Sequence, residues 1–375
     1  MDDSNRAPPE DILYEPIRLM KVLHIYPGND SMVTKHVTML AEGMRLSADI
    51  RTADNSASAR QLLREQEPDI VHCHGCWQYF VARTAASAIR QGARVILTLH
   101  GQLEPWVISQ QSMQDKVCKS MLWQRDAVRR AYAVITLGRL ERENFKHLGW
   151  NPRIEEIHNA VITNTISPSE MVSQTFAVYQ KVMDSNTLEL MDEIERRQLA
   201  TILKAGLTGD RRWIGNEDVP GHVSRQLLIY AEHEGIRNYV DYGINLLGLS
   251  APLIDTEKIA AYMPPSYTRP RPIKEIIGDY EGNETDYLLR IITQLHKAPL
   301  LLHLTELARE LYRDSINDEH IAAMLEERGL LAFTQRLMQI LSEQLLLDEG
   351  YMPVDPINDR QTQRIRKIIT SHLKI

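Results

Sequence analysis

Short apolar runs alternate with amphipathic stretches from residue 19 to about residue 165. The runs are rich in Val, Ile and Leu, whereas the stretches between them repeat apolar residues at the helical period. Nearly continuous apolar strands separated by helices are typical of a parallel sheet that is covered on both faces by right-handed crossovers. The pattern therefore predicts a doubly wound α/β domain over residues 19–165, with five helices and six strands: MKVLHIYP, ADIRTAD, DIVHCHG, RVILTLHG, AVITLG and RIEEIHNAVI.

The pattern changes after Ser167, where every periodic segment is helical. Ser167 suits an N-cap and Pro168 suits the first turn of a helix, so the segment TNTISPSE marks the junction. We therefore expect a tail over residues 1–18 and an all-α domain over residues 166–375, interrupted by a proline-rich loop near 264–272. The expected helices are Ser169–Glu195, Arg196–Ala205, His222–Leu247, Glu284–Leu295, Ala298–Leu311 and Glu319–Leu346.

Composition narrows the class of protein. The chain has 375 residues, 43% of them apolar and 25% charged, which suits a globular protein of two domains. A net charge of −7 argues against a nucleic-acid partner, because binding to nucleic acid depends on Lys and Arg. The chain has only three cysteines, an acidic start and no long apolar run, so we expect a cytoplasmic protein, with possible peripheral contact at the inner face of a membrane.

Polar residues gather where the predicted strands end, which is where parallel sheets bind ligands. The first strand ends in a turn that contains Gly28, Asn29, Asp30 and Ser31 and leads into a helix, whose N-terminus suits an anion. The turn lacks the G-x-G-x-x-G pattern, which argues against a nicotinamide or flavin cofactor.

The third strand ends in His72-Cys73-His74-Gly75-Cys76, which has both a metal and a redox interpretation. A zinc site would need four ligands, and the chain has no second Cys or His pair at a comparable spacing, so we expect no metal. A C-x-x-C motif between a strand and a helix also suits a dithiol oxidoreductase. Two buried, inert cysteines are the simpler interpretation, since free Cys is among the most buried residue types.

The fourth strand ends in TLHGQLEPW, which contains His100, Gly101, Glu104 and Trp106. A histidine at the end of a strand can hydrogen-bond a sugar or a phosphate, and the glycine after it lets a ligand approach the backbone. A satisfied core or loop histidine is the alternative interpretation.

These segments in their order resemble the N-terminal domain of family 4 glycosyltransferases: KVLHIYP, HCHG, TLHG, ITLGRLERENFKHLG and HNAVI. The resemblance implies a Rossmann-like domain, the acceptor half of a bacterial-type GT-B enzyme of polysaccharide biosynthesis. Such an enzyme moves a sugar from a nucleotide-sugar to a glycan or lipid-linked acceptor, with retention, without a metal and without a cofactor other than the donor. By this resemblance His100 is the catalytic candidate facing the donor sugar. His72, His74 and the Tyr26–Ser31 loop border the acceptor, with Gly75, Gly101, Glu104 and Trp106 as further substrate-binding candidates.

Three departures from the family pattern bear on function. Ser31 and Met32 replace the paired glycines after the first strand, and Ala160 and Ile162 replace Gly and Asp in the linker. The second Rossmann-like domain, which binds the donor, is not recognisable, and the pair Glu319 and Glu327 lacks the surroundings of the family's E-x7-E motif. The basic residues that could take over the donor phosphates are Arg211, Arg212, Arg225 and Arg237, and a partner protein could instead supply a donor domain.

A basic helix within residues 114–131 suits contact with an anionic membrane or, equally, a solvated crossover. Two alternatives to the enzyme stay open. One is a non-catalytic module that binds a glycan or a protein with a degenerate glycosyltransferase half. The other is the dithiol oxidoreductase, which requires a lowered pKa at Cys73.

Overall fold

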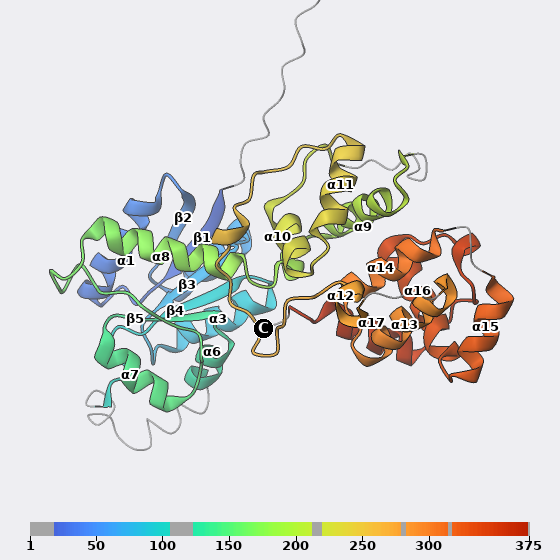
Figure 1. Ribbon diagram of the computed structural model, residues 1–375. Coiled ribbons are helices and arrows are strands. Elements are labelled where there is room, and N and C mark those ends of the chain that lie inside the picture. The colour runs from blue at the N-terminus through green and yellow to red at the C-terminus, as the bar shows by residue number, and fades with distance from the viewer. Residues whose placement is uncertain (1–18, 106–122, 212–219, 279–282, 314–316, 374–375) are drawn as a thin grey trace, which may run out of the picture. The chain divides into compact units, whose positions relative to one another are not determined.

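The computed structural model of the chain describes residues 19–105, 123–211, 220–278, 283–313 and 317–373 (Figure 1). It divides into two compact units, Met1–Tyr179 and Gln180–Ile375. The first contains the sheet and the second is helical, so the predicted fold class, a Rossmann-like α/β domain followed by an all-α region, is confirmed.

The first unit is built on one parallel sheet of six strands in the order β2-β1-β3-β4-β5-β6. Every neighbouring pair is parallel, as the continuous apolar runs predict. The strand order reverses between β1 and β3, where a doubly wound sheet opens its ligand crevice. The strands are β1 (Met20–Ile25), β2 (Ala48–Ala53), β3 (Ile70–His74), β4 (Arg94–Thr98), β5 (Ala133–Thr136) and β6 (Ile154–Glu156).

Connection handedness explains which helices cover each face of this sheet. The connection from β1 to β2 runs in the opposite direction from the others, so its helix α1 (Ser31–Met44) lies on the opposite face. The other crossovers pack side chains onto Leu23, Val71 and Val95 of the sheet, forming one apolar core. They are α2 (Ser56–Gln66), α3 (Tyr79–Arg90), α6 (Arg125–Arg130) and α7 (Arg139–Leu148).

Helix α8 (Pro168–Met183) shares the face of α1. Figure 1 shows it beside α1, and Gly43 of α1 lies so close to it that an added Cβ would come within 2.5 Å of a Val172 methyl carbon. Met171 and Tyr179 of α8 are fully buried. The sequence pattern predicts a domain boundary at residue 165, before this helix, whereas the structure assigns the helix up to Tyr179 to the first unit.

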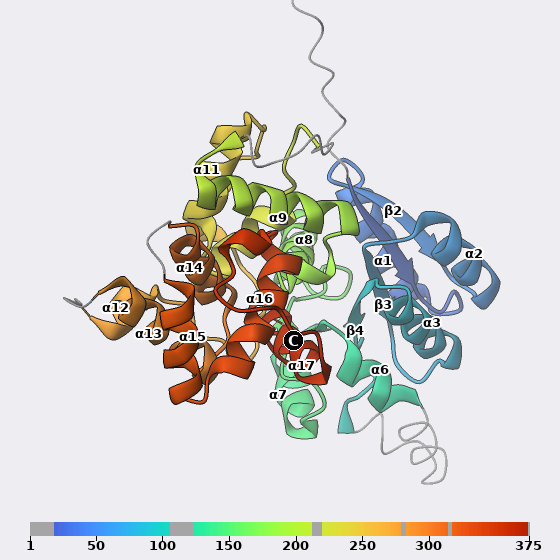
Figure 2. The ribbon, with the colours of Figure 1, turned by 90° about the vertical axis from the view of Figure 1, so that its right-hand side faces the viewer.

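In the described residues of the second unit the regular elements are helices, apart from one isolated bridge between His222 and Ser250 (Figure 2). Asp192 caps the start of α9 with a capping box, so the helix expected over 169–195 is broken before it. Residues 259–272, which contain the proline-rich segment, form neither helix nor strand. The helices are α9 (Glu193–Thr208), α10 (Arg225–His233), α11 (Arg237–Leu247), α12 (Ile273–Ile277), α13 (Glu284–Lys297), α14 (Leu301–Leu311), α15 (Asp318–Glu327), α16 (Leu331–Leu345) and α17 (Arg360–Thr370).

Candidate active site

Histidines occupy one face of the sheet at the carboxyl ends of its central strands. His24 of β1 is the register partner of His72 of β3, and His74 of β3 is the partner of Thr98 of β4. Side chains alternate between faces along a strand, so these four residues point to the same side. The residues between them, such as Cys73, belong to the apolar core on the other face. This face is therefore polar where the opposite face is apolar.

Three further elements complete the group. Helix α1 contributes His36, the loop after β4 contributes His100, and α8 contributes Tyr179. We call His24, His36, His72, His74 and His100 the histidine cluster. The first four are buried and His100 is partly exposed. His100 is thus the member of the cluster that a ligand reaches most directly.

Hydrogen bonds connect the buried members. His74 Nε2 lies 2.9 Å from His24 Nδ1, and His74 Nδ1 lies 3.2 Å from His100 Nε2. His72 Nδ1 lies 2.6 Å from the Tyr179 hydroxyl, and His72 Nε2 lies 2.7 Å from the Thr98 hydroxyl. Both ring nitrogens of His72 and of His74 are therefore engaged.

The hydrogen bonds of Asn159 fix the proton position on His36. Asn159 Oδ1 accepts from the Val161 backbone N–H at 3.0 Å, which identifies this atom as the amide oxygen. The same oxygen lies 3.1 Å from His36 Nδ1. An oxygen of this kind only accepts, so Nδ1 carries the proton and, in the neutral ring, Nε2 carries the lone pair.

Burial keeps the cluster uncharged. Desolvation, with a smaller contribution from the neighbouring His36, lowers the pKa of His24 and of His100 to about 3. Burial and the other imidazoles also hold the pKa of His72 and His74 well below the ordinary value. At neutral pH the cluster is therefore a set of neutral donors and acceptors, without net charge.

Backbone strain sets the direction of His100. This residue has φ +54° and Gly101 has φ +72°, both in the left-handed region, where a non-glycine residue is strained. Buried Glu141 accepts a hydrogen bond from the Gly101 N–H at 2.5 Å and from the Leu137 N–H at 2.6 Å, which ties the turn to the start of α7. Strain of this kind gathers at functional sites.

The other candidates at the strand ends have defined contacts. Asp30 caps α1 by accepting from the Met32 and Val33 N–H groups, and Ser31 is the first residue of that helix. The backbone turns at Gly75 with φ +84°, beside the Gln102 side chain. Exposed Asn29 precedes Asp30, and buried Glu104 accepts from the Asn144 amide. Trp106 lies outside the described residues.

Three of the donor-phosphate candidates, Arg211, Arg225 and Arg237, lie in the described part of the second unit. Arg225 pairs with Asp184 at 2.9 Å, and Arg237 pairs with Asp241 one helical turn away at 2.7 Å. Arg211 is exposed, and Arg212 lies outside the described residues. A role in phosphate binding stays a prediction for all four.

Cys73 and Cys76 belong to the apolar core on the other face of the sheet. Both are buried free thiols. Desolvation raises the pKa of the Cys73 thiol to about 12 and holds that of Cys76 well above its usual value, with Glu141 adding to the effect. A dithiol oxidoreductase needs the opposite shift, because the thiolate is the reactive form. These surroundings favour inert cysteines.

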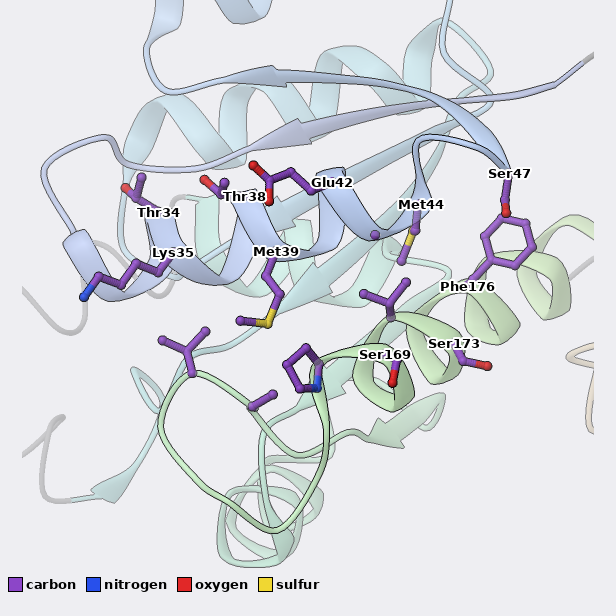
Figure 3. Close-up of a pocket in the computed structure, with 15 residues that line it drawn as sticks. Thr34, Lys35, Thr38, Met39, Glu42, Met44, Ser47, Ser169, Ser173 and Phe176 are labelled. Atoms are coloured by element: carbon purple, nitrogen blue, oxygen red, sulfur yellow. The ribbon is translucent and has the colours of Figure 1, made fainter.

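A groove with a volume of about 1080 Å³ lies between α1, residues 160–161 and the start of α8 (Figure 3). Met39 and Phe176 give it apolar walls, and hydroxyl groups such as those of Thr34 and Ser169 line it as well. Its margin at Val161 adjoins Asn159, the residue that binds His36. The groove thus lies on the same helical layer that covers the histidine face.

Sequence reasoning missed His24, His36, Asn159, Glu141 and Tyr179. A signal for His24 was present, because His24, His72 and His74 each occur within an apolar strand, at positions that a parallel register can align. His36 and Tyr179 come from helices whose rotation the sequence pattern does not fix. Their contribution follows only from the packing of α1 and α8.

The fold and the site define the first unit as a Rossmann-like domain with a polar site at the carboxyl edge of its sheet. The family model described as Glycosyltransferase Family 4 matches residues 36–165, which span four of the five histidines of the cluster. The resemblance to the N-terminal domain of this family is thereby confirmed over these residues, and a glycosyltransferase-like function is supported in general terms. No curated protein and no solved structure matches the chain significantly.

None of the described helices combines the length and the apolar character needed to cross a membrane.

Proposed function

We propose that the first unit is the acceptor half of a retaining glycosyltransferase that moves a sugar from a nucleotide-sugar to a glycan or lipid-linked acceptor. The observation that carries the proposal is the family match over residues 36–165, together with His100 at the carboxyl end of β4. In this proposal the nucleotide-sugar is a co-substrate, the transfer itself needs no metal ion, and the chain has no other cofactor.

His100 is the proposed catalytic residue. It is partly exposed, neutral, and held by a strained turn that Glu141 anchors. A preorganised hydrogen-bonding group of this kind positions the donor sugar and stabilises the charge that develops as the diphosphate departs. Buried His74 forms a hydrogen bond with His100 and so helps to fix the orientation of its ring.

The acceptor is proposed to bind along the strand ends and the groove beside α1. Asn29, Asp30, Ser31, Gly75 and Gly101 are the proposed contacts at the strand ends, with Glu104, Trp106, His72 and His74 around them. The apolar walls at Met39 and Phe176, together with the hydroxyl groups, suit an amphipathic acceptor such as a lipid-linked sugar.

Peripheral membrane contact belongs to the same proposal. Helix α6 lies within the described part of the basic segment 114–131 and contains Arg125, Arg129 and Arg130. These side chains could attract the anionic inner face of a membrane, where a lipid-linked acceptor would reside.

The donor diphosphate is proposed to bind to Arg211, Arg212, Arg225 and Arg237, or to a partner protein that supplies a donor domain. Arg225 and Arg237 would have to exchange their carboxylate partners for phosphate, which is a charge-assisted interaction of similar geometry. An acidic chain gives no support for a nucleic-acid partner.

A second candidate function is a non-catalytic module that binds a glycan or a protein. It is favoured by the second unit, whose described residues are helical where the family would have a second sheet. In that case the site would hold a sugar without transferring one.

Release of nucleoside diphosphate tests the catalytic proposal. The full chain is incubated with a panel of UDP- and GDP-sugars and a mixture of glycan and lipid-linked acceptors, and the released UDP or GDP is measured. We expect release that His100→Ala reduces by on the order of 100-fold or more, as for loss of a preorganised stabilising group. The exposed His147→Ala is the matched control. Equal release by wild type and His100→Ala would contradict the role of His100, and binding without release would favour the non-catalytic module.

A further inference from the structure

The histidine cluster contains two groups of three imidazoles that converge on a point. One group is His24, His72 and His74, and the other is His36, His74 and His100. In each group every residue offers a ring nitrogen, and the three nitrogens lie within 4.8 Å of one another. Neutral imidazole is a preferred ligand of zinc and neighbouring transition-metal ions. We propose that His36, His74 and His100 bind one such ion, with Zn²⁺ as the expected occupant.

The hydrogen bonds distinguish between the two groups. Both ring nitrogens of His72 are engaged by hydroxyl groups, of Tyr179 and of Thr98. Coordination through His72 would break one of these buried hydrogen bonds and leave a hydroxyl without its partner, at a cost of about 1–3 kcal/mol. His36 makes one hydrogen bond, through Nδ1, and keeps Nε2 available. His74 Nδ1 and His100 Nε2 face each other, so an ion between them would replace their mutual bond without leaving a third group unpaired. The group that contains His36 is therefore the better site.

The outer nitrogens of two ligands already have the partners that metal-binding histidines require. His36 donates Nδ1–H to Asn159 Oδ1, which leaves the lone pair of Nε2 for an ion. His74 Nε2 faces His24 Nδ1 at 2.9 Å, and with Nε2 as the donor the lone pair of His74 lies on Nδ1, toward His100. Partners of this kind orient the ring and raise its basicity as a ligand.

The remaining hydrogen bonds agree with this proton arrangement. If His24 accepts at Nδ1, its Nε2–H points to the Tyr179 oxygen, 3.5 Å away. Tyr179 then donates to His72 Nδ1, and His72 donates from Nε2 to Thr98. One direction of donation thus satisfies each of these hydrogen bonds and leaves the lone pair of His74 Nδ1 directed toward His100. A bound ion would select this direction over the reverse.

The distances also suit an ion. His74 Nδ1 and His100 Nε2 lie 3.2 Å apart. With Zn–N bonds of about 2.0–2.1 Å, two ligands of a tetrahedral ion have nitrogens about 3.3–3.4 Å apart. His100 is partly exposed, so the ion has a path from solvent and a fourth position for water. The strained backbone at His100 then has a function, because it directs this ligand into the cluster.

This site departs from the metal-free site expected from sequence, and it does not rest on sugar transfer. The zinc interpretation that the sequence analysis set aside centred on the HCHGC motif, whose cysteines belong to the apolar core on the other face of the sheet. The ion proposed here uses one residue of that motif, His74, with two histidines from elsewhere in the chain. The test of this proposal therefore measures metal binding alone. A negative result would leave the proposed glycosyltransferase function untouched.

Zinc titration of the untagged full chain tests the proposal. The chain is stripped with a chelator, dialysed, and titrated with Zn²⁺ in competition with a chromophoric chelator at neutral pH. We expect one ion per chain, and an affinity that falls by on the order of 100-fold in His36→Gln and by about 10- to 100-fold in Asn159→Ala, which removes the partner of His36. The exposed His320→Gln is the matched control and should bind as wild type does.

Two further measurements keep the outcome decisive if a cluster variant unfolds. Circular dichroism of each variant shows whether it folds, and Co²⁺ added to the wild-type chain should give the intense visible bands of a tetrahedral nitrogen site. Loss of binding in His72→Gln with full binding in His36→Gln would assign the ion to the other group and overturn the proposal. Absence of stoichiometric zinc and of the cobalt bands in the wild-type chain would overturn it as well.

Discussion

His100 holds a backbone conformation that its side chain does not favour. The left-handed region costs a non-glycine residue about 1–2 kcal/mol, and Asn tolerates it better than His does. The neighbouring Gly101 carries φ +72° without that cost. The turn after β4 therefore places an imidazole at the sheet edge at the expense of stability, which is typical of a residue kept for function.

We predict that His100→Asn leaves the free energy of unfolding of the first unit within about 1 kcal/mol of wild type, because relief of strain offsets the lost bond to His74. By contrast, Leu99→Ala removes a fully buried side chain and should cost about 2–5 kcal/mol. Hydrogen exchange of the sheet amides measures both. A loss of several kcal/mol in His100→Asn would show that His100 is chiefly structural.

The buried imidazoles make stability depend on pH. The pKa of His24 and of His100 is about 3 in the folded chain and near 6.5 in the unfolded chain. A lowered folded pKa means that the unfolded state takes up the proton first, so stability is present above pH 6.5 and falls as the pH drops toward the folded pKa. Each such group should lower the free energy of unfolding by about 2 kcal/mol as the pH falls from 7 to 5.

Protection factors of the β1 and β3 amides at the two pH values test this prediction. We expect lower protection at pH 5, with a smaller loss in His24→Gln, which removes one titrating group. Equal protection at pH 7 and pH 5 would mean that the imidazoles are already protonated or exposed in the folded chain.

Among the elements, α8 decides how the histidine face is covered. Its Tyr179 bonds to His72, and its Val172 packs against Gly43 of α1. The period of α8 was readable from the sequence, but its packing was not, because an apolar helical stripe does not specify the surface that it covers. Once the strand order is known, the handedness of the crossovers places α1, and none of the other crossover helices, on this face. This face is therefore the one that α8 can cover.

We predict that Gly43→Ala destabilises the first unit by about 1–3 kcal/mol, because the new Cβ would lie 2.5 Å from a Val172 methyl carbon. Val172→Ala in the same chain should restore much of this loss by making room. A double-mutant cycle, read by hydrogen exchange of α1 and α8, gives the coupling energy. Additive effects of the two substitutions would contradict the close approach of these helices.

At the scale of the whole molecule, the two units differ in how much the sequence reveals. The strands and crossovers of the first unit follow from apolar period and turn chemistry, which are local. The histidine cluster draws on residues from His24 to His100 along the chain, so only the HCHG and TLHG segments of it carry a recognisable spacing. The second unit is helical both in the sequence prediction and in the structure, yet its described residues contain no motif that indicates a binding partner.

The described residues of the second unit form no second sheet, which makes donor binding the central question. Calorimetric titration of the full chain with UDP- and GDP-sugars, in wild type and in His100→Asn, tests it most directly, because that variant should stay folded. We predict that wild type binds one class of donor and that His100→Asn binds it at least about tenfold more weakly, which corresponds to about 1.4 kcal/mol. Absence of heat with every donor at millimolar concentration would contradict catalysis by this chain alone.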